Sequence, residues 1–296
     1  MYEIMSKAVL ADNIKLLEVY VPNIAEKAKP GQFVIVRNNE QGERIPLTIA
    51  DFDREKGLIT LIFQEVGRST LDMGKLEKGD SFLDVVGPLG KPSVIEKFGK
   101  VVCVGGGVGI APVYPIARAL YEKGNYVISI LGARTGDSLI WEEKMGAISN
   151  ELYVTTDDGS YGEKGRVTDV LSRIAADDAI DMVIAIGPLV MMESVCAVTK
   201  PRGIKTLVSL NPIMLDGTGM CGACRVEVGN EKKFACVDGP EFDGHLVDWE
   251  NAKQRAMMFK KQEKMAEETG KEFQLHSNHK CSCHDEGGDH QCQKKN

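Results

Sequence analysis

Several features are scarce in this sequence, and each scarcity narrows what the protein can be. Basic residues are fewer than acidic ones, 36 Lys and Arg against 43 Asp and Glu, for a net charge of −7. Without a basic stripe, nucleic acid is excluded as the main partner. The longest apolar runs, such as residues 182–192, are too short to span a bilayer. The first residues lack a basic stretch followed by an apolar one, so we expect no secretory signal, no membrane association and a cytoplasmic location.

The cysteines are few but unevenly placed. The chain has eight of them, and six lie in the last third of the sequence. In a reducing compartment, clustered cysteines usually serve as metal ligands rather than as disulfide partners. The length of 296 residues favours about two domains, and an apolar fraction of 43% is enough to build their cores.

Residues 1–97 read as an all-β domain. Short runs rich in Val, Ile, Phe and Tyr are separated by Gly, Asp and Asn, and no long helical pattern intervenes: KLLEVYVP, GQFVIVRN, GLITLIFQEV and DSFLDVVG. This pattern predicts a small antiparallel β-barrel.

The pattern changes at residues 98–210, where apolar strands alternate with helical segments. The predicted strands are KVVCVG, YVISILGA, ELYVTTDD, MVIAIGP and KTLVSL. The predicted crossover helices are APVYPIARALYEKG, IWEEKMGAI, VTDVLSRIA and MMESVCAVTKPRG. Near-continuous apolar strands with helices between them indicate a doubly wound parallel α/β sheet.

Three shorter regions follow. Residues 211–247 form a loop-rich module with three closely spaced cysteines, residues 248–274 read as one charged helix, and residues 275–296 form a polar tail rich in Cys and His. The tail has either weak, incidental metal affinity or a metal site of its own.

A glycine-rich turn joins the first α/β strand to the following helix. Its glycines are Gly105, Gly106, Gly107 and Gly109. Glycines in this context let the backbone approach a diphosphate, and the helix N-terminus offers free N–H groups. Pro112 stands where the third glycine of the usual G-x-G-x-x-G motif would be. The alternative is a tight packing turn, and the Gly187–Pro188 turn after a later strand has the same two interpretations.

The end of the second α/β strand bears on nucleotide choice. An acidic residue there usually binds the ribose of NAD, whereas an arginine accommodates the 2′-phosphate of NADP. The residue here is Arg134, so this rule taken alone favours NADP.

A β-barrel followed by GGGVGIAP, TDDGSYGEKG and GP resembles the ferredoxin–NADP reductase superfamily, whose members bind FAD on the barrel and a pyridine nucleotide on the second domain. RIPLTIAD is similar to that family's flavin motif, Arg-x-x-Ser/Thr. Thr48 matches the hydroxyl position, whereas Arg44 lies one residue too early. EVGRST resembles the second flavin segment, and VGPLG the segment that closes the barrel. Thr48 is thereby expected at the isoalloxazine, as the residue closest to catalysis; the alternative is an ordinary strand threonine.

The resemblance implies a set of cofactor-binding positions. For FAD they are Arg44, Ile45, Pro46, Leu47, Thr48, Ile49, Gln64, Val66, Gly67, Ser69 and Thr70. For the nucleotide they are Gly105, Gly106, Gly107, Val108, Gly109, Ile110, Pro112, Gly132, Arg134, Thr135, Asp157, Asp158, Gly187, Pro188 and Met191. The resemblance favours NAD(H) over NADP, because one arginine at a strand end can also contact a ribose or a diphosphate.

The cysteine spacing in MLDGTGMCGACRVEV explains the clustered thiols. Plant-type [2Fe–2S] proteins space three ligands C-x₄-C-x₂-C, with a distant fourth cysteine. This chain reads Asp216-x₄-Cys221-x₂-Cys224, and Cys236 follows. A carboxylate thus replaces the first thiolate, and this harder donor should alter the potential and lability of the cluster. We predict these four residues as ligands of a [2Fe–2S] cluster.

Other interpretations of these four residues remain open. The three cysteines could bind zinc with one further ligand, or Asp216 could only cap the Asp-Gly turn. Cys103 and Cys196 lie in apolar segments and are predicted to be packing residues. His245 follows the cluster segment without an evident partner.

Across residues 3–250, the chain is similar to the small subunit of NAD-dependent ferredoxin:NADP oxidoreductase, where Asp216 would match a three-cysteine-plus-aspartate ligand set. It also resembles the electron-transfer subunits of dihydroorotate dehydrogenase, which have four cysteines. The first resemblance implies a larger partner subunit with its own flavin and [4Fe–4S] centres, and ferredoxin reached through the complex by electron bifurcation. The second resemblance makes the electron-transfer subunit of a dihydroorotate dehydrogenase the alternative function. A third hypothesis is a nucleotide-binding module with structural zinc.

Overall fold

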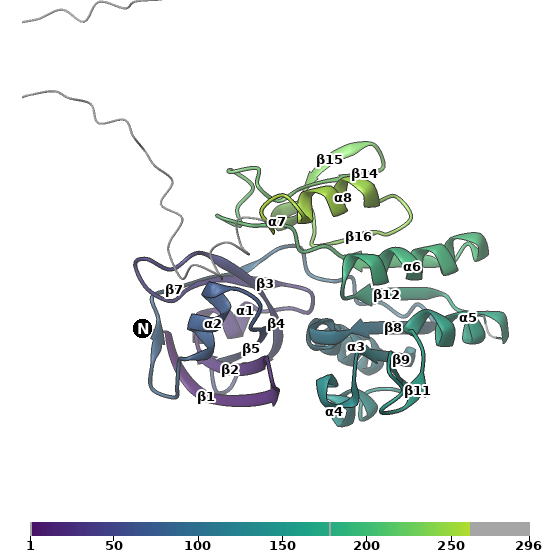
Figure 1. Ribbon diagram of the computed structural model, residues 1–296, viewed down its shortest axis with the longest axis horizontal. Helices are drawn as coiled ribbons and strands as arrows, with labels where there is room; N and C mark the ends of the chain where they lie inside the picture. The colour runs from purple at the N-terminus through teal and green to yellow at the C-terminus, as the bar shows by residue number, and fades with distance from the viewer. Residues whose placement is uncertain (1, 178, 261–296) are drawn as a thin grey trace, which may run out of the picture.

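The computed structural model describes residues 2–177 and 179–260, and its first domain is a strongly curved antiparallel sheet (Figure 1). The strand order is β6-β1-β2-β5-β4-β3-β7. Its edge strands β6 and β7 are separated in the chain by Leu83 alone, so the sheet comes close to closing on itself, as predicted. The strands are β1 (Tyr2–Ala11), β2 (Ile14–Tyr20), β3 (Phe33–Arg37), β4 (Ile45–Asp53), β5 (Leu58–Gln64), β6 (Ser81–Phe82) and β7 (Asp84–Leu89), with short helices α1 (Pro22–Lys27) and α2 (Arg68–Gly74).

Alternating residues of these strands fill the barrel. On β5, Ile59, Leu61 and Phe63 point inward and are at most 2% exposed. Each such side chain contributes about 1.5–3 kcal/mol on burial. The period-two pattern therefore fixes which face of each strand stays available on the outside of the barrel.

The second domain is an α/β sheet of order β11-β10-β9-β8-β12-β13-β16, in which all pairs except β13–β16 are parallel. The strands are β8 (Lys100–Gly106), β9 (Tyr126–Ala133), β10 (Glu151–Thr156), β11 (Glu163–Lys164), β12 (Met182–Ile186), β13 (Lys205–Ser209) and β16 (Glu241–Asp243). The helices are α3 (Ile110–Glu122), α4 (Glu142–Gly146), α5 (Val167–Asp177) and α6 (Leu189–Thr199), with short 3₁₀ turns Gly107–Gly109, Gly136–Ser138 and Lys200–Arg202.

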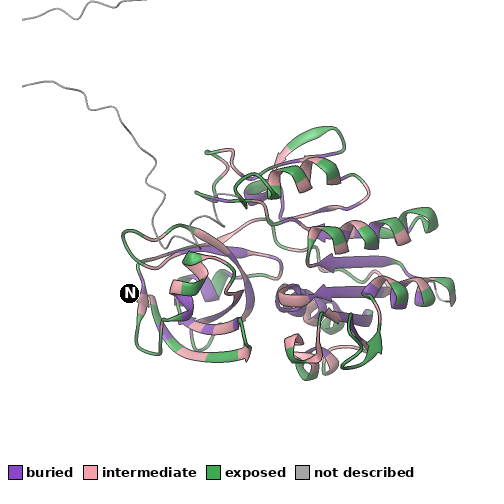
Figure 2. Cartoon of the chain, in the orientation of Figure 1, coloured by how far each residue is buried: buried purple, intermediate pink, exposed green. Residues whose placement is uncertain are grey.

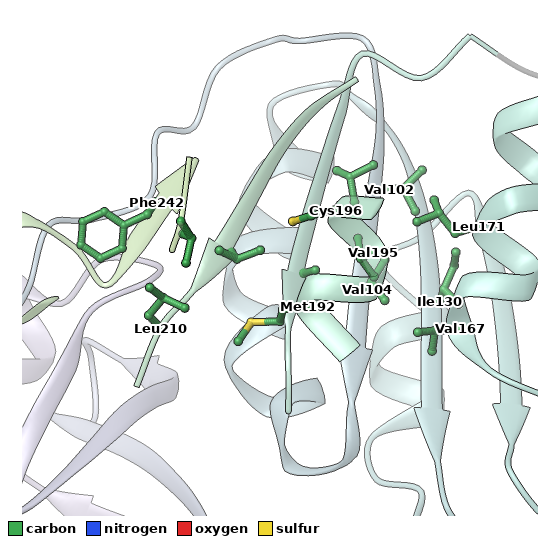
Figure 3. Packing of buried hydrophobic residues seen from close by; sticks show 14 of the residues in the cluster. Val102, Val104, Ile130, Val167, Leu171, Met192, Val195, Cys196, Leu210 and Phe242 are labelled. Atoms are coloured by element: carbon green, nitrogen blue, oxygen red, sulfur yellow. The ribbon is translucent and has the colours of Figure 1, made fainter. Parts of the chain in front are cut away.

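Helices cover both faces of this sheet. Val102 and Val104 of β8 pack with residues of α5 and α6 (Figure 3), whereas Val101 and Cys103 pack with α3 on the opposite face. The central strands are buried, and the outer faces of the helices are exposed (Figure 2). The predicted doubly wound sheet is confirmed.

The C-terminal module adds to this sheet. It contains the hairpin β14 (Arg225–Val228) and β15 (Glu231–Phe234), helix α7 (Ala235–Asp238), strand β16 and helix α8 (Trp249–Ala256). The hairpin turns at Gly229–Asn230, with φ of 62° and 63°, as a tight two-residue turn requires. Strand β16 pairs antiparallel with β13, an attachment that the sequence pattern did not predict.

The end of the chain differs from the continuous helix expected over 248–274. Helix α8 ends at Ala256, and residues 257–259 form a turn, so the described residues do not continue one helix from residue 248. Residues 261–274 and the Cys/His tail at 275–296 lie outside the described residues. Within the described part of the chain, no helix is long and apolar enough to cross a membrane.

Candidate functional site

The glycine turn after β8 packs against the turn after β12. A β-carbon on Gly106 would lie 2.3 Å from Met191 Sδ, and one on Gly109 would lie 2.4 Å from the Ile186 carbonyl oxygen. On Gly187, a β-carbon would lie 2.7 Å from Met191 Cε. Close packing requires glycine at position 109, where the facing atoms are backbone, whereas at Gly106 and Gly187 the facing atoms are the flexible end of Met191. This packing also joins the two loops at the point where the strand order reverses, which is where folds of this kind bind ligands.

Gly107 has a different environment. Its φ is +56°, and a β-carbon there would meet no atom within 4 Å. Gly107 and Val108 are half-buried between fully buried neighbours. Pro112 lies in the first turn of α3, where its missing N–H breaks no helical hydrogen bond. Gly107 is thus the glycine of this turn whose backbone is open to a ligand, whereas Gly105 and Ile110 are buried supports.

Charged residues line the neighbouring strand ends. Arg134 follows β9 and is exposed, as are Asp157 and Asp158 after β10. The Asp158 N–H donates to the Arg134 carbonyl at 3.3 Å, so the two ends lie side by side. Hydrogen bonds from the Ser160 hydroxyl and N–H, at 2.7 and 2.9 Å, lower the pKa of Asp158. Arg134 therefore shares its surroundings with two carboxylates.

Two other predicted nucleotide positions belong to the same edge of the sheet. Gly132 lies at the end of β9, where a β-carbon would be 2.5 Å from Val167 Cγ1. The Thr135 hydroxyl hydrogen-bonds that of Ser138 at 3.0 Å. Gly132 thus allows close packing of α5, and Thr135 stabilises the following turn.

Strand β4 presents the predicted flavin residues. Leu47 and Ile49 point into the barrel core, and the half-buried Ile45 packs against the same core, whereas Pro46 and Thr48 are half-buried on the outer face. All five were predicted to bind FAD, but only Pro46 and Thr48 face away from the core, because alternate residues of a strand point to opposite faces. Further along the strand, Ala50 belongs to the apolar core shared with α3 of the second domain.

The second flavin segment meets the first in space. The Ser69 hydroxyl donates to Glu43 Oε2 at 2.7 Å, and Glu43 precedes the exposed Arg44. The Thr70 hydroxyl accepts the N–H groups of Val66 and Gly67 at 3.0 and 3.1 Å, which caps α2.

Within that segment, Thr70 therefore has a structural role, and Ser69 joins the two segments. Gln64 ends β5, half-buried. Sequence reasoning missed Glu43, whose carboxylate brings a negative charge to this face of the barrel.

The four predicted cluster ligands form two pairs. Asp216 accepts the Cys221 N–H at 3.1 Å, and the Cys221 thiol lies 3.5 Å from the other carboxylate oxygen. The sulfurs of Cys224 and Cys236 are 3.2 Å apart. Cys221 is exposed, whereas Cys224 and Cys236 are buried.

The loop that holds these ligands is bent by glycine. Gly217, Gly219 and Gly222 have φ values of +77°, +86° and +67°, which side chains other than glycine rarely adopt. The Gly219 N–H hydrogen-bonds the Cys236 sulfur, while burial and the neighbouring Cys224 raise the pKa of the Cys236 thiol to about 12. Asp216 has a lowered pKa, first because it accepts the Thr218 N–H.

The donor set fits a two-iron cluster. A [2Fe–2S] cluster takes four ligands over two irons. The Asp216–Cys221 and Cys224–Cys236 pairs match that division, and the Gly219 N–H already points at a ligand sulfur.

Contacts around the loop add two residues that the sequence did not reveal. Arg255 of α8 donates to the Ala223 carbonyl at 2.8 Å and so holds the loop between two cysteines. His245, which had no predicted partner, hydrogen-bonds Thr199 of α6 at 2.9 Å. Neither contact has a local sequence signal, because both join segments that are distant in the chain.

Family models match two parts of the chain: the iron–sulfur cluster binding domain of dihydroorotate dehydrogenase B over residues 211–248, and an oxidoreductase NAD-binding domain over residues 103–197. A Thermotoga maritima homologue of the dihydroorotate dehydrogenase B (NAD⁺) electron transfer subunit is 48% identical over 90% of this chain and 94% of its own.

The corresponding subunit of Geobacillus thermodenitrificans is 33% identical over 81% of this chain and 94% of its own. Among solved structures, a chain of an NADH-dependent reduced ferredoxin–NADP oxidoreductase, from work on flavin-based electron bifurcation, is 48% identical. It covers 90% of this chain and 97% of its own, with a TM-score of 0.86. The resemblances drawn from the barrel, the glycine turn and the cysteine loop are thus confirmed, and the chain belongs to the family of dihydroorotate dehydrogenase B electron transfer subunits and their homologues.

Proposed function

We propose that this chain is the flavin and iron–sulfur electron-transfer subunit of an electron-bifurcating, NADH-dependent ferredoxin:NADP oxidoreductase. The observation that carries the proposal is the Asp216 carboxylate beside Cys221, at the place of the first cluster ligand. The similarity to a chain of that oxidoreductase, 48% over 90% of this chain, supports it. Residues 1–97 would bind FAD, 98–210 the nucleotide and 211–247 the cluster.

The barrel would bind FAD through the outer face of β4 and the turn before α2. Pro46 and Thr48 are half-buried on the outer face of β4, and Ala50 further along this strand packs against α3 of the second domain, so a flavin ring there would lie between the two domains. Ser69 would reach the diphosphate side, with its hydrogen bond to Glu43 exchanged for one to the ligand. When bound, flavin supplies the exchange between two-electron hydride chemistry and single-electron steps.

The nucleotide would be NAD(H). Asp157 and Asp158 stand at the strand end beside Arg134, and two carboxylates disfavour the dianionic 2′-phosphate of NADP while they can accept ribose hydroxyl hydrogen bonds. Gly107 would let the backbone approach the diphosphate. Arg134 would then contact the diphosphate or the ribose.

The two ligand pairs would hold the [2Fe–2S] cluster, with Asp216 and Cys221 on one iron and Cys224 and Cys236 on the other. The chain's contribution is to exclude water from the Cys224–Cys236 pair, to donate an N–H to the Cys236 sulfur and to fix the loop through Arg255. A larger subunit with its own flavin and [4Fe–4S] centres would receive the electrons, and ferredoxin would be reached through that complex. Five free thiols in the described residues fit a cytoplasmic location.

Anaerobic titration of the isolated subunit with NADH and with NADPH tests the proposal. We expect extracted FAD, rather than FMN, and flavin bleaching by NADH in preference to NADPH. Preference for NADPH would overturn the nucleotide assignment. Thr48→Ala should slow bleaching while iron content stays unchanged; full activity in this variant would count against a flavin role for Thr48.

Iron and sulfide content, with EPR of the reduced protein, tests the cluster. Asp216→Cys should keep the cluster and shift its potential, because thiolate and carboxylate donate differently to iron. Asp216→Ala should lower cluster occupancy with FAD retained. Identical spectra and potentials in all three proteins would make Asp216 a turn residue only.

The second candidate is the electron-transfer subunit of a dihydroorotate dehydrogenase. The 33% identity to such a subunit favours it, whereas an aspartate in place of the first cysteine does not. Affinity purification of the tagged chain from its own cells, followed by identification of the larger subunit, separates the two candidates.

A further inference from the structure

An ion pair joins the two cofactor-binding domains. Arg118 of α3 lies 2.8 Å from Oδ1 of Asp51 on β4, and Lys144, next to α3 on α4, lies 3.6 Å from Oδ2. The side chains of Arg118 and Asp51 are 24% and 18% exposed. A pair this far removed from water is held in one geometry more firmly than a fully exposed pair.

A bulge in β4 aims Asp51 at the second domain. Ile49 pairs with Leu61 of β5, but Asp51 pairs with Thr60, the next residue, so that Ala50 is the extra residue. Without the bulge, Asp51 would share the inward face of Ile49. With it, Asp51 lies on the outer face, as Thr48 does.

Aromatic rings surround the two cations. The Arg118 guanidinium lies 5.2 Å from the Tyr114 ring centre, and Lys144 lies 4.3 Å from that of Trp141. Tyr114 and Trp141 pack edge to face at 5.1 Å. Trp141 has a φ of 54°, a left-handed conformation that a bulky residue adopts only where its surroundings impose it.

Cohesion between the domains comes from apolar contact. Ala50 and Ile62 of the barrel share one buried core with Ile110 and Ala117 of α3. Apolar contact is not directional, whereas an ion pair with fixed hydrogen-bond geometry is. Because a partly buried ion pair adds little net stability, its main physical effect is to select one placement of α3 on β4.

We propose that the Asp51–Arg118 pair, supported by Lys144, is a positioning device that sets where the nucleotide loop lies relative to the flavin strand. Asp51 follows Thr48 by three residues on β4, and Arg118 lies on the helix that begins at the glycine turn. The inference rests on the proposed function. Hydride donors and acceptors must lie within roughly 3–3.5 Å, and a shift of about 1 Å can cost a hundredfold in rate.

The test is stopped-flow reduction of the FAD-loaded, full-length chain by NADH, with variants Asp51→Asn, Arg118→Gln and Arg118→Lys. We expect the limiting reduction rate to fall about tenfold or more in the first two, with FAD content, iron content and the NADH concentration at half-saturation nearly unchanged. Arg118→Lys, which keeps the charge, should recover most of the rate. Lys144→Gln should have a smaller effect of the same kind.

Lys56→Gln is the matched control, since it removes an ion pair to Asp53 at the end of the same strand but within the barrel. Its rate should equal that of the wild type. Equal limiting rates in Asp51→Asn, Arg118→Gln, Lys144→Gln and wild type would overturn the proposal, as would a rate loss that always accompanies FAD loss. If NADH fails to reduce the wild type, the proposed function itself is wrong.

Discussion

Two loops of this protein are rich in glycine, and they use it for different reasons. In the nucleotide loop, Gly109 has an ordinary φ of −65°, but a β-carbon there would collide with the backbone of the facing turn at 2.4 Å. In the cluster loop, Gly222 has a φ of +67°, yet its nearest neighbour would be 3.7 Å from a β-carbon. The first loop lacks space, and the second needs an unusual backbone conformation.

The two reasons for glycine follow from how each loop is held in the fold. The nucleotide loop is fixed between two parallel strands, so its glycines serve to bring two turns together and leave Gly107 open. The cluster loop is fixed by few strand contacts, so its glycines bend a surface segment around the ligands. A shared composition therefore does not imply a shared mechanism, and the two loops should respond differently to reagents and to substitutions.

Thiol alkylation should show the largest difference. Cys103, two residues before the nucleotide loop, has a pKa raised to about 12 because it is fully buried. Cys221 of the cluster loop is exposed. After iron is removed with a chelator, brief iodoacetamide treatment in native buffer should label Cys221 roughly tenfold faster or more, since the thiolate reacts and burial both raises the pKa of Cys103 and keeps the reagent away from it.

Peptide mass spectrometry measures both sites in one sample. Cys196, with a pKa raised to about 12 first by burial, is a second slow site within the α/β domain. Comparable labelling of Cys103 and Cys221 would show that the sheet opens as readily as the loop, and would remove the contrast.

Substitution of Gly109 by alanine should come next in size. Its new methyl group would meet the Ile186 carbonyl group and Gly187 Cα, all of them backbone atoms that cannot move aside locally. We expect a loss of about 3 kcal/mol in the free energy of unfolding, measured by urea denaturation. The matched control, Gly107→Ala, meets no atom but has a φ of +56°, and should cost about 1 kcal/mol.

If Gly109→Ala and Gly107→Ala lower the free energy of unfolding by the same amount, crowding is not the reason for glycine at position 109. A weaker NADH affinity in Gly107→Ala, with stability almost retained, would support Gly107 as the glycine open to the nucleotide.

Much of the architecture could be predicted from the sequence, because the signals were local. Near-continuous apolar runs predicted the parallel strands, and short β-rich runs between turn residues predicted the barrel. The spacing from Asp216 to Cys224 predicted which residues of the loop would serve as cluster ligands, and in what order. Each of these depends on residues a few positions apart, which share one backbone conformation.

The remaining features depend on contacts between distant segments. Nothing local indicates that β16 joins the edge of the nucleotide sheet, or that His245 meets Thr199. The bulge at Ala50 is visible only from the pairing of β4 with β5, so the outward aim of Asp51 could not be predicted. The sequence also left open whether the glycine turn packs or binds; the β12 turn that lies against it makes Gly109 a packing glycine, while a diphosphate contact at Gly107 stays a prediction.

The smallest expected effect is also the most specific to the comparison. Replacing glycine by alanine should destabilise one loop more than replacing it by asparagine does, and the other loop less. At Gly222, alanine should cost about 1 kcal/mol, because its β-carbon disfavours positive φ, and asparagine should cost less, since it tolerates that region better than other side chains. Space is not limiting there, as the nearest atom is Phe234 Cε1 at 3.7 Å. At Gly109, asparagine should cost more than alanine, because it places a larger side chain against the same backbone. Thermal unfolding of the four variants measures the order. Asparagine worse than alanine at both positions would mean that the cluster loop, too, is limited by space.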